Sequence, residues 1–256
     1  MLFVIDVGNT NTVLGLYDGP RALHTWRIST LTRTTDEAGL LFLQLLAHEG
    51  HRAEQVTGAA ICCVVPSTLY ALEKACRRYL GTTPKVIGAG TDFGVQVKVD
   101  NPRELGPDRV VNVFAARKRH TPPFLIVDFG TATTFDAVDA DGAYVGGAIA
   151  PGLQISADAL FSRTSRLPRV EVQRPPRAIG TNTVSAMQSG LFWGYVGLVD
   201  GLARRVKDEL GGPGAQMPCV ATGGLANLVG RACREVDEVD EHLTLDGLVA
   251  WYASVP

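Results

Sequence analysis

Short apolar runs and segments with apolar residues at helical spacing follow one another in a regular order along the chain. Apolar runs bounded by glycine turns are typical of β-strands, and apolar positions three and four residues apart are typical of helices. Thr34 or Thr35 is expected to open the first helix, and Gly50 to close it. The first half is predicted to have a hairpin at residues 3–19, strands at 21–30, 58–65 and 84–90, and helices at 34–50, 66–81 and 105–120.

The second half of the chain repeats this order of elements. It is predicted to have a hairpin at residues 125–142, helices at 155–162 and 182–212, a strand, turn and helix at 218–233, and a closing helix at 243–254. Strands that alternate with helices favour an α/β fold in which helices pack against a sheet. The segment TPPF at 121–124 breaks the chain between the halves. We place the boundary near residue 118, with domains at residues 1–118 and 119–256.

The two hairpins share one pattern. FVIDVGNTNTVLGLYDG begins at residue 3 and LIVDFGTATTFDAVDADG at residue 125, and each runs an apolar strand into Asp-x-Gly and a polar turn. A glycine placed after a strand-terminal aspartate lets the backbone approach a ligand closely. Two ordinary hairpins would explain the turns but not the paired aspartates. One offset of 122 residues pairs Asp6 with Asp128, Gly8 with Gly130, Thr12 with Thr134, Val13 with Phe135 and Leu16 with Val138.

Composition and charge narrow the class of protein. The chain has 256 residues, 46% of them hydrophobic, which is enough to fill one large core or two smaller ones. The net charge is −2, and the 24 basic and 26 acidic residues are mixed along the sequence. No basic stripe indicates nucleic acid and no polybasic run indicates a membrane surface, so neither is an expected partner.

Neither a membrane span nor a secretion signal is expected. The longest strongly apolar stretch, GLLFLQLLA at residues 39–47, is far shorter than the roughly 20 residues of a transmembrane helix. No basic segment precedes LFVID near the N-terminus. The five cysteines lack C-x-x-C spacing, which favours buried thiols over disulfides or zinc ligands. We therefore expect a cytoplasmic protein.

The paired turns suit a nucleotide. Backbone N–H groups of glycine-rich turns and threonine hydroxyls bind phosphate, and an aspartate at a strand end can hold a cation. The segment ATGGLA at 221–226 adds a third glycine turn beside a predicted helix start, suited to the adenosine and ribose end. The chain has no Gly-Lys dipeptide, which excludes a Walker A loop, and DFG at 128–130 belongs to a hairpin rather than to a protein-kinase motif.

These motifs carry a family resemblance. DVGNTNTVLGLYDG, DFGTATTFD and ATGGLA look like the two phosphate motifs and the adenosine motif of the acetate and sugar kinase, Hsp70 and actin superfamily. NPRELGPDRVVNVFAA, GGAIAPGL and GTNTVSAMQSGLFWGYVG resemble the type III pantothenate kinases, and this match extends from residue 3 to about residue 250. The resemblance implies an α/β protein of two duplicated ribonuclease-H-like domains, the actin-like ATPase fold, with the active site in the cleft between them.

The resemblance also implies an enzyme that uses ATP to phosphorylate the primary hydroxyl of pantothenate, the first step of coenzyme A biosynthesis. Asp108 would be the catalytic proton acceptor, and Asp128 would hold potassium or ammonium in addition to the Mg²⁺ that accompanies ATP. The expected pantothenate residues are Gly106, Pro107, Asp108, Arg109 and Thr183. The expected ATP residues are Asp6, Val7, Gly8, Asn9, Thr10, Asn11, Thr12, Val13 and Thr131.

The residues of the implied pantothenate site also have structural interpretations. Asp108 after Pro107 would favour a helix N-terminus. Arg109 could pair with Glu104, and Thr183 could cap a helix. An adjacent aspartate and arginine nevertheless offer an acceptor for a hydroxyl proton beside a cation for a carboxylate, and pantothenate carries both groups.

Alternatives to the implied function remain. Thr131 could be an ordinary turn residue. Val99 stands where many relatives have tyrosine, and Pro107 stands where alanine is common, although neither change removes a catalytic group. Another kinase of the superfamily, a phosphohydrolase or a non-enzymatic regulator would share the nucleotide turns.

The predicted helix at 182–212 carries glycines at positions 190, 194, 197 and 201. Each glycine costs about 1 kcal/mol of helix stability relative to alanine, so a packing reason is expected. Apolar side chains are expected to surround this stripe: Leu191, Phe192, Trp193, Tyr195 and Val196. We therefore expect a homodimer in which the helix packs against its copy, with Thr183 reaching the substrate across the interface, as the resemblance implies. A core helix of a monomer is the alternative.

Overall fold

The computed structural model describes residues 1–88 and 91–255, and its contacts divide the chain into two compact units. The first unit comprises Met1–Gly94, Asn101–Ala115 and Leu243–Pro256, and the second comprises Val95–Asp100 and Ala116–His242. The closing helix α7 (Leu243–Ser254), which the sequence prediction placed in the C-terminal domain, packs on the sheet of the first unit. As a boundary between domains, residue 118 stays a prediction.

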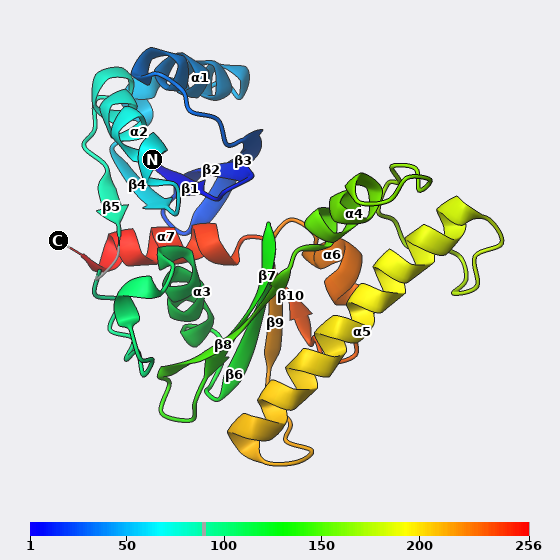
Figure 1. Cartoon of the computed structure of the whole chain (residues 1–256). Helices are drawn as coiled ribbons and strands as arrows, with labels where there is room; N and C mark the ends of the chain where they lie inside the picture. Colours follow the sequence, from blue (N-terminus) through cyan, green and yellow to red (C-terminus); the bar gives the residue numbers. More distant parts are fainter. Residues whose placement is uncertain (89–90, 256) are drawn as a thin grey trace. The chain divides into compact units, whose positions relative to one another are not determined.

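The sheet of the first unit has the strand order β3-β2-β1-β4-β5 (Figure 1). β1 pairs antiparallel with β2 and parallel with β4. The strands are β1 (Leu2–Val7), β2 (Asn11–Asp18), β3 (Arg21–Ser29), β4 (Gly58–Cys63) and β5 (Lys85–Ile87). The helices of this part are α1 (Thr35–His48), α2 (Pro66–Tyr79) and α3 (Pro107–Arg117), with short turns of 3-10 helix at Ala53–Gln55 and Pro102–Glu104.

Alternation along β1 decides which side chains face which helices. Phe3, Ile5 and Val7 are buried in one core with side chains of α1 and α2. Successive side chains of a strand point to opposite faces, so Val4 and Asp6 lie on the other face. There, a Cβ atom added to Gly15 would contact both Val4 and a leucine of α7. The aspartate at the end of β1 is therefore kept out of the α1 and α2 core.

The second unit repeats this topology. Its sheet has the order β10-β9-β6-β7-β8, in which β6 pairs antiparallel with β7 and parallel with β9. This is the arrangement of the first sheet with β6 in the place of β1, so the predicted fold of two duplicated ribonuclease-H-like α/β domains is confirmed. The position of the active site in a cleft stays a prediction. The strands are β6 (Phe124–Phe129), β7 (Ala132–Val138), β8 (Tyr144–Pro151), β9 (Cys219–Thr222) and β10 (Glu238–Val239).

The two hairpins differ by one residue in their turns. In the first hairpin Val7 pairs with Thr12, whereas in the second Phe129 pairs with Thr133. The structural equivalent of Thr12 is therefore Thr133, and the predicted pairing with Thr134 is wrong because the second turn is one residue shorter. The predicted pairings of Val13 with Phe135 and of Leu16 with Val138 are wrong by the same one residue. Thr12 and Thr133 are both buried. Because Thr133 and Thr134 follow one another after the second turn, the sequence alone does not show where this turn lacks a residue.

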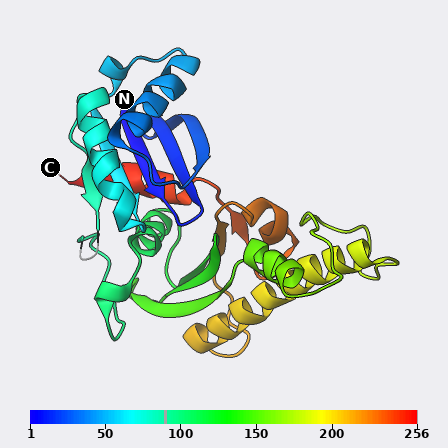
Figure 2. The ribbon, with the colours of Figure 1, turned by 45° about the horizontal axis from the view of Figure 1, so that its top comes forward.

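The long helix α5 (Thr183–Gly211) packs along the second sheet and contacts α4 (Leu153–Ser162) and α6 (Ala226–Val229) (Figures 1 and 2). Its buried side includes Phe192, Tyr195 and Val196, which share a core with Phe129 and Phe135. The expectation that these three side chains leave apolar surface around the glycine stripe is wrong, because the chain's own sheet covers them.

The glycines of α5 lie on a different side of the helix. A Cβ atom added at Gly190, Gly194 or Gly197 would meet nothing within 4 Å. No close packing in the described chain therefore explains this stripe.

The other predicted elements are present, with small shifts at their ends. The capping box of α1 starts at Thr34, whose side chain accepts the N–H of Glu37, and Gly50 follows the helix at φ +77°. The strand expected at 84–90 is found as β5, and residues 89 and 90 lie outside the described residues. Among the described residues, no helix is both long enough and apolar enough to cross a membrane.

Candidate active site

Asp6 lies at the end of β1, between two neighbouring strands. Its backbone pairs with Val13 of β2 and with Cys62 of β4. The strand ends one residue later, and the turn that follows is closed by a hydrogen bond from the Gly8 N–H to the Asn11 carbonyl at 3.0 Å. The carboxylate therefore stands beside the opening of the first turn.

The tip of the first turn is the part that a ligand can reach. Asn9 and Thr10 are exposed, whereas Val7 and Thr12, which belong to the flanking strands, are buried. The side chains of the predicted ATP residues are thus of two kinds. The exposed side chains of the tip can contact a ligand, and the buried side chains of Val7 and Thr12 hold the turn in place.

Thr30 is a residue of this turn that sequence reasoning missed. Its hydroxyl donates to the Gly8 carbonyl at 2.7 Å and lies 2.9 Å from the Thr12 hydroxyl. Its N–H donates to the Thr10 carbonyl at 2.9 Å. The only sequence signal is that a threonine ends the strand predicted at residues 21–30, which is too common a feature to single it out.

Asp108 stands in the first turn of α3, directly after Pro107. Its Oδ1 accepts the N–H of Arg109 at 2.9 Å. A Cβ atom on Gly106 would overlap this same oxygen, so glycine leaves the carboxylate room. Burial raises the pKa of the Asp108 carboxyl, and the N–H and charge of Arg109 partly oppose the rise. A carboxylate with a raised pKa accepts a proton more readily near neutral pH.

The alternative in which Arg109 pairs with Glu104 is not the arrangement observed. Glu104 instead accepts from the side-chain amide of Asn101 at 2.6 Å. Asn101 also accepts the N–H of Arg103, so this group belongs to the short helix before α3. The ion pair of Arg109 with Glu104, which the sequence suggested, is therefore not supported.

The thiol of Cys62 shows that two of the predicted site residues are neighbours. Cys62 is fully buried, and its pKa is raised by burial first and then by the charges of Asp6 and Asp108. Asp6 is paired with Cys62 across β1 and β4, so their side chains lie on the same face of the sheet, and the charge of Asp108 also acts on the thiol. The first unit thus brings the predicted proton acceptor together with the aspartate of the first turn, although they are far apart in sequence.

Asp128 occupies in β6 the place that Asp6 has in β1. It pairs with Thr134 of β7 and with Thr222 of β9. Gly223 follows β9 at φ +92°, which favours glycine. A Cβ atom there would overlap both Asp128 Oδ1 and the main chain of Phe129. The glycine turn predicted from ATGGLA therefore lies directly against the Asp128 carboxylate.

The second turn is held by the residue after β8. The Gly130 N–H donates to the Ala132 carbonyl, and the Gly152 N–H donates to the Thr131 carbonyl, each at 3.1 Å. A Cβ atom on Gly152 would overlap the carbonyl oxygens of both Gly130 and Thr131. Glycine at position 152 thus lets the end of β8 approach the turn closely.

Thr183 is the first residue of α5 and is exposed. The helix is capped by Asn182, whose side chain accepts the N–H of Ser185 at 2.9 Å. The interpretation of Thr183 as the cap is therefore wrong. No hydrogen bond of the Thr183 hydroxyl is found within residues 1–88 and 91–255, so its hydroxyl faces solvent.

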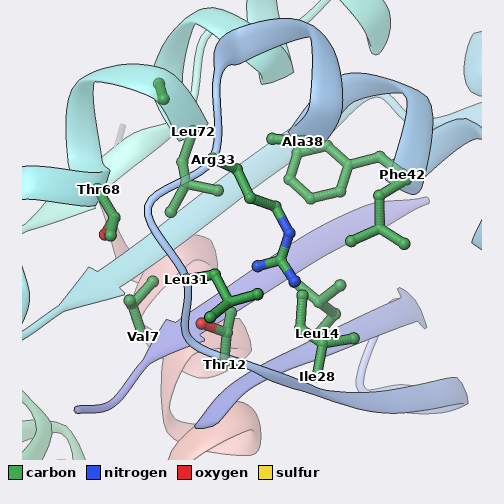
Figure 3. A pocket seen from close by; sticks show the side chains of 12 residues that line it. Val7, Thr12, Leu14, Ile28, Leu31, Arg33, Ala38, Phe42, Thr68 and Leu72 are labelled. Carbon is green, nitrogen blue, oxygen red and sulfur yellow. The ribbon is translucent and has the colours of Figure 1, made fainter. Parts of the chain in front are cut away.

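A pocket elsewhere in the first unit is a second candidate ligand site, separate from the one at Asp6 (Figure 3). Its lining is chiefly apolar and comes from the sheet and from α1 and α2, with Val7 and Phe42 among the lining residues. The Arg33 side chain extends into it, and its guanidinium donates to the Ser29 carbonyl at 3.0 Å. Because Val7 and Asp6 alternate along β1, this pocket lies on the opposite face of the sheet from Asp6.

The acidic residues of the site do not form a complete metal centre. In the described part of the chain, no group of three or more His, Cys, Asp or Glu side chains could hold a metal ion. Hard cations prefer oxygen ligands, so an ion at Asp6 or Asp128 would need turn carbonyls or phosphate oxygens as well. The turn beside Asp128 has carbonyls at Gly130 and Thr131. One carboxylate with these carbonyls fits a cation that is bound together with a phosphate ligand.

The family model and the relatives found by sequence agree on one family. A family model described as type III pantothenate kinase matches residues 2–205. A type III pantothenate kinase of Anaeromyxobacter sp. (strain Fw109-5) is 54% identical over 249 residues, which cover 97% of each chain. One of Myxococcus xanthus (strain DK1622) is 52% identical over 249 residues, covering 97% of this chain and 96% of the other. A solved structure of a candidate 2-dehydro-3-deoxygalactonokinase from Sinorhizobium meliloti shares the fold, with a TM-score of 0.62, 13% identity and 99% of each chain covered.

Replacing Asp108 by asparagine is expected to stabilise the folded chain at neutral pH. The folded-state pKa is raised by burial, so the unfolded chain loses this proton at a lower pH than the folded chain. Stability therefore falls as pH rises from the unfolded pKa through the folded pKa, and it stays lower above that range. Asparagine keeps the oxygen that accepts from Arg109 but carries no buried charge. Urea unfolding should show Asp108→Asn more stable than the wild type at pH 8, with a difference that shrinks toward pH 3; a variant less stable at pH 8 would contradict this account.

Proposed function

The chain belongs to the type III pantothenate kinase family, and from this membership we propose that it transfers a phosphoryl group from ATP to the primary hydroxyl of pantothenate. The product is 4'-phosphopantothenate, and the reaction is the first step of coenzyme A biosynthesis. The acceptor is an alcohol, so the chain is a phosphotransferase. We also propose that it acts in the cytoplasm, where ATP is available.

One observation supports the proposed mechanism: the buried Cys62, which is paired with Asp6 across β1 and β4, also experiences the charge of Asp108. Phosphoryl transfer depends mainly on positioning and on electrostatic stabilisation. We assign the electrostatic function to Asp6 at the phosphate turn and the positioning of the acceptor hydroxyl to Asp108. Asp108 orients the hydroxyl and accepts its proton, and the raised pKa of its carboxyl suits that role.

The residues around Asp108 fit the rest of the substrate. Pantothenate has a carboxylate, and Arg109 offers a guanidinium directly beside the proton acceptor, with donors that match a carboxylate. Gly106 leaves space at the Asp108 oxygen. Pro107 stands at the first position of α3, where a missing N–H costs nothing, so the substitution relative to the family leaves the start of the helix intact.

We assign ATP binding to the first turn, from Asp6 to Val13, and to Thr131 of the second turn. The exposed tip at Asn9 and Thr10 supports this assignment, because its main chain can approach phosphate oxygens. Mg²⁺ bound with ATP supplies positive charge that neutralises the phosphates, and Asp6 is the residue of the first unit that we assign to it. Val7 and Thr12 contribute by fixing the turn, since both are buried.

We assign the monovalent cation to Asp128. Its carboxylate lies against the glycine turn at Gly223, and the carbonyls of Gly130 and Thr131 belong to the turn that follows it. A carboxylate with neutral carbonyls suits an ion that gives up its water easily, such as potassium or ammonium. Such an ion would offset the negative charge of the Asp128 carboxylate and of the ATP phosphates.

We further propose a homodimer that forms through the glycine stripe of α5. Gly190, Gly194 and Gly197 are exposed and meet nothing in the chain, yet each costs helix stability. Close approach of a second helix would explain them. Thr183, whose hydroxyl faces solvent at the start of the same helix, would then contact pantothenate bound to the partner.

Purified protein is expected to phosphorylate pantothenate with ATP, and Asp108→Asn is expected to lower kcat by about 10² to 10⁴-fold. Its ATP affinity by calorimetry should change little, because the amide keeps the shape of the carboxylate. A loss below about tenfold would refute Asp108 as the proton acceptor. A panel of sugars and other small alcohols separates this activity from that of another kinase of the superfamily. A wild-type protein that transfers phosphate to no acceptor would favour the regulatory alternative.

Activity with Mg-ATP is expected to be low in sodium or Tris buffer and to rise with saturation when potassium or ammonium is added. Ionic strength must be held constant, because screening alone changes phosphate binding. Asp128→Asn should weaken the activation, as it removes the charged ligand. Equal initial rates in sodium and potassium, measured with pantothenate as acceptor, would show that Asp128 holds no monovalent ion.

Sedimentation is expected to show a species of twice the 27.3 kDa chain mass. Gly194→Leu should convert the dimer into monomers and lower activity, because the new side chain blocks close approach of a second helix. Glu209→Leu places the same side chain at an exposed position elsewhere on α5 and is the matched control. A fully active wild-type monomer at assay concentration would exclude both the dimer and the role of Thr183 across it.

A further inference from the structure

The two phosphate turns are stabilised by different residues, although their strands are equivalent. In the first unit Asn11 pairs with Ser29, and in the second Ala132 pairs with Pro151. The next residue in each case donates its N–H to the turn: Thr30 to the Thr10 carbonyl and Gly152 to the Thr131 carbonyl. Thr30 and Gly152 are therefore equivalent in the main chain.

Their side chains are not equivalent. The Thr30 hydroxyl joins the buried Thr12 hydroxyl to the main-chain carbonyl of Gly8. Gly152 has no side chain, and any Cβ atom there would overlap the carbonyls of the second turn. The second turn therefore cannot be braced by a hydroxyl from the strand that corresponds to β3.

A hydroxyl from α5 occupies the corresponding place. The Tyr195 hydroxyl donates to the Pro151 carbonyl at 3.0 Å and makes a short hydrogen bond with the Thr133 hydroxyl. Thr133 is the structural equivalent of Thr12. A tyrosine hydroxyl has one proton; since it is donated to Pro151, Thr133 is the donor in the second bond. The order is thus Thr133 hydroxyl, Tyr195 hydroxyl, Pro151 carbonyl.

These two hydrogen bonds form a relay from Thr133 through Tyr195 to Pro151, and both ends of this relay adjoin the second turn. Thr133 is paired with Phe129, the last residue before Gly130. Pro151 directly precedes Gly152, which is bonded to Thr131. The Tyr195 ring also lies beside the Phe129 ring, with 6.5 Å between centroids. Tyr195 is 5% exposed, and burial raises the pKa of its hydroxyl, so the neutral donor form is kept.

We propose that Tyr195 is a positioning residue for the second phosphate turn, and that its hydroxyl fixes the turn from α5 as Thr30 fixes the first turn from the adjoining strand. This inference rests on the proposed binding of ATP phosphates by Thr131. Positioning matters because displacements of about 1 Å far from the reacting atoms can cost up to about 10²-fold in rate. Tyr195 itself touches neither substrate.

The test compares variants that remove one hydroxyl. Tyr195→Phe keeps the ring against Phe129, and Thr133→Val removes the donor at the other end of the relay. Each is expected to raise the KM for ATP or lower kcat by about tenfold, while the KM for pantothenate stays within about twofold. Thr133→Ser restores a hydroxyl and should restore the kinetics. The double variant Tyr195→Phe with Thr133→Val should be no worse than the poorer single variant, because both interrupt one relay.

Tyr17→Phe is the matched control. Tyr17 is also fully buried, and its hydroxyl donates to Asp246 at 2.9 Å within the first unit, at the end of β2 away from the turn. Its removal should lower the melting temperature without changing the KM for ATP. If Tyr195→Phe and Thr133→Val behave like Tyr17→Phe, losing stability with unchanged kinetics, Tyr195 has no positioning role and the inference is overturned.

Direct binding separates this inference from the proposed function. Calorimetry with a non-hydrolysable ATP analogue should show weaker binding by Tyr195→Phe and Thr133→Val than by the wild type. A wild type that binds the analogue but does not phosphorylate pantothenate would refute the proposed acceptor and leave the Tyr195 comparison intact. A wild type that binds no analogue would refute both. Should Tyr195→Phe fail to fold, the comparison of Thr133→Val with Thr133→Ser decides the question.

Discussion

The pairing of each central strand with its neighbours is the constraint on which the rest of the structure depends. Along β1 and β6, alternate side chains fill a helix-covered core, and the aspartate at each strand end points to the other face. A slip of one residue would turn Asp6 or Asp128 into an apolar core, where an unpaired carboxylate is costly. The register that stabilises the two sheets therefore also keeps both carboxylates out of the core.

The burial of the Asp108 carboxyl in the first unit works against stability. Burial raises the pKa of Asp108, which means that ionising this carboxyl costs folding free energy. The same shift makes Asp108 a better proton acceptor near neutral pH. Perturbed carboxyls are typical of functional sites, and a stability cost at one such carboxyl is the usual exchange between activity and stability.

The helix α5 serves the second unit in more than one way. One side of α5 fills the core beneath β6 and β7, and Tyr195 on that side is bonded next to the second turn. The glycines lie exposed on another side, and Thr183 stands at the N-terminus. A helix that carries all three features would connect subunit association, substrate contact and the geometry of the phosphate turn through one rigid element.

The sequence alone determined most of the elements, the duplicated hairpins, the fold class and the family, because these follow from local periodicity and from motifs that neighbouring residues define. It also predicted Asp6, Asp108 and Asp128 as candidate site residues. It missed the strands β8 and β10. Only the tertiary structure decided that Thr133 is the equivalent of Thr12, that Asn182 rather than Thr183 caps α5, and that Phe192 is used within the chain's own core. It alone revealed Thr30 and Tyr195, and it alone brought Asp6 and Asp108 to one thiol. Turn length, burial and hydroxyl partners are set by packing between segments far apart in sequence, and no local pattern records that packing.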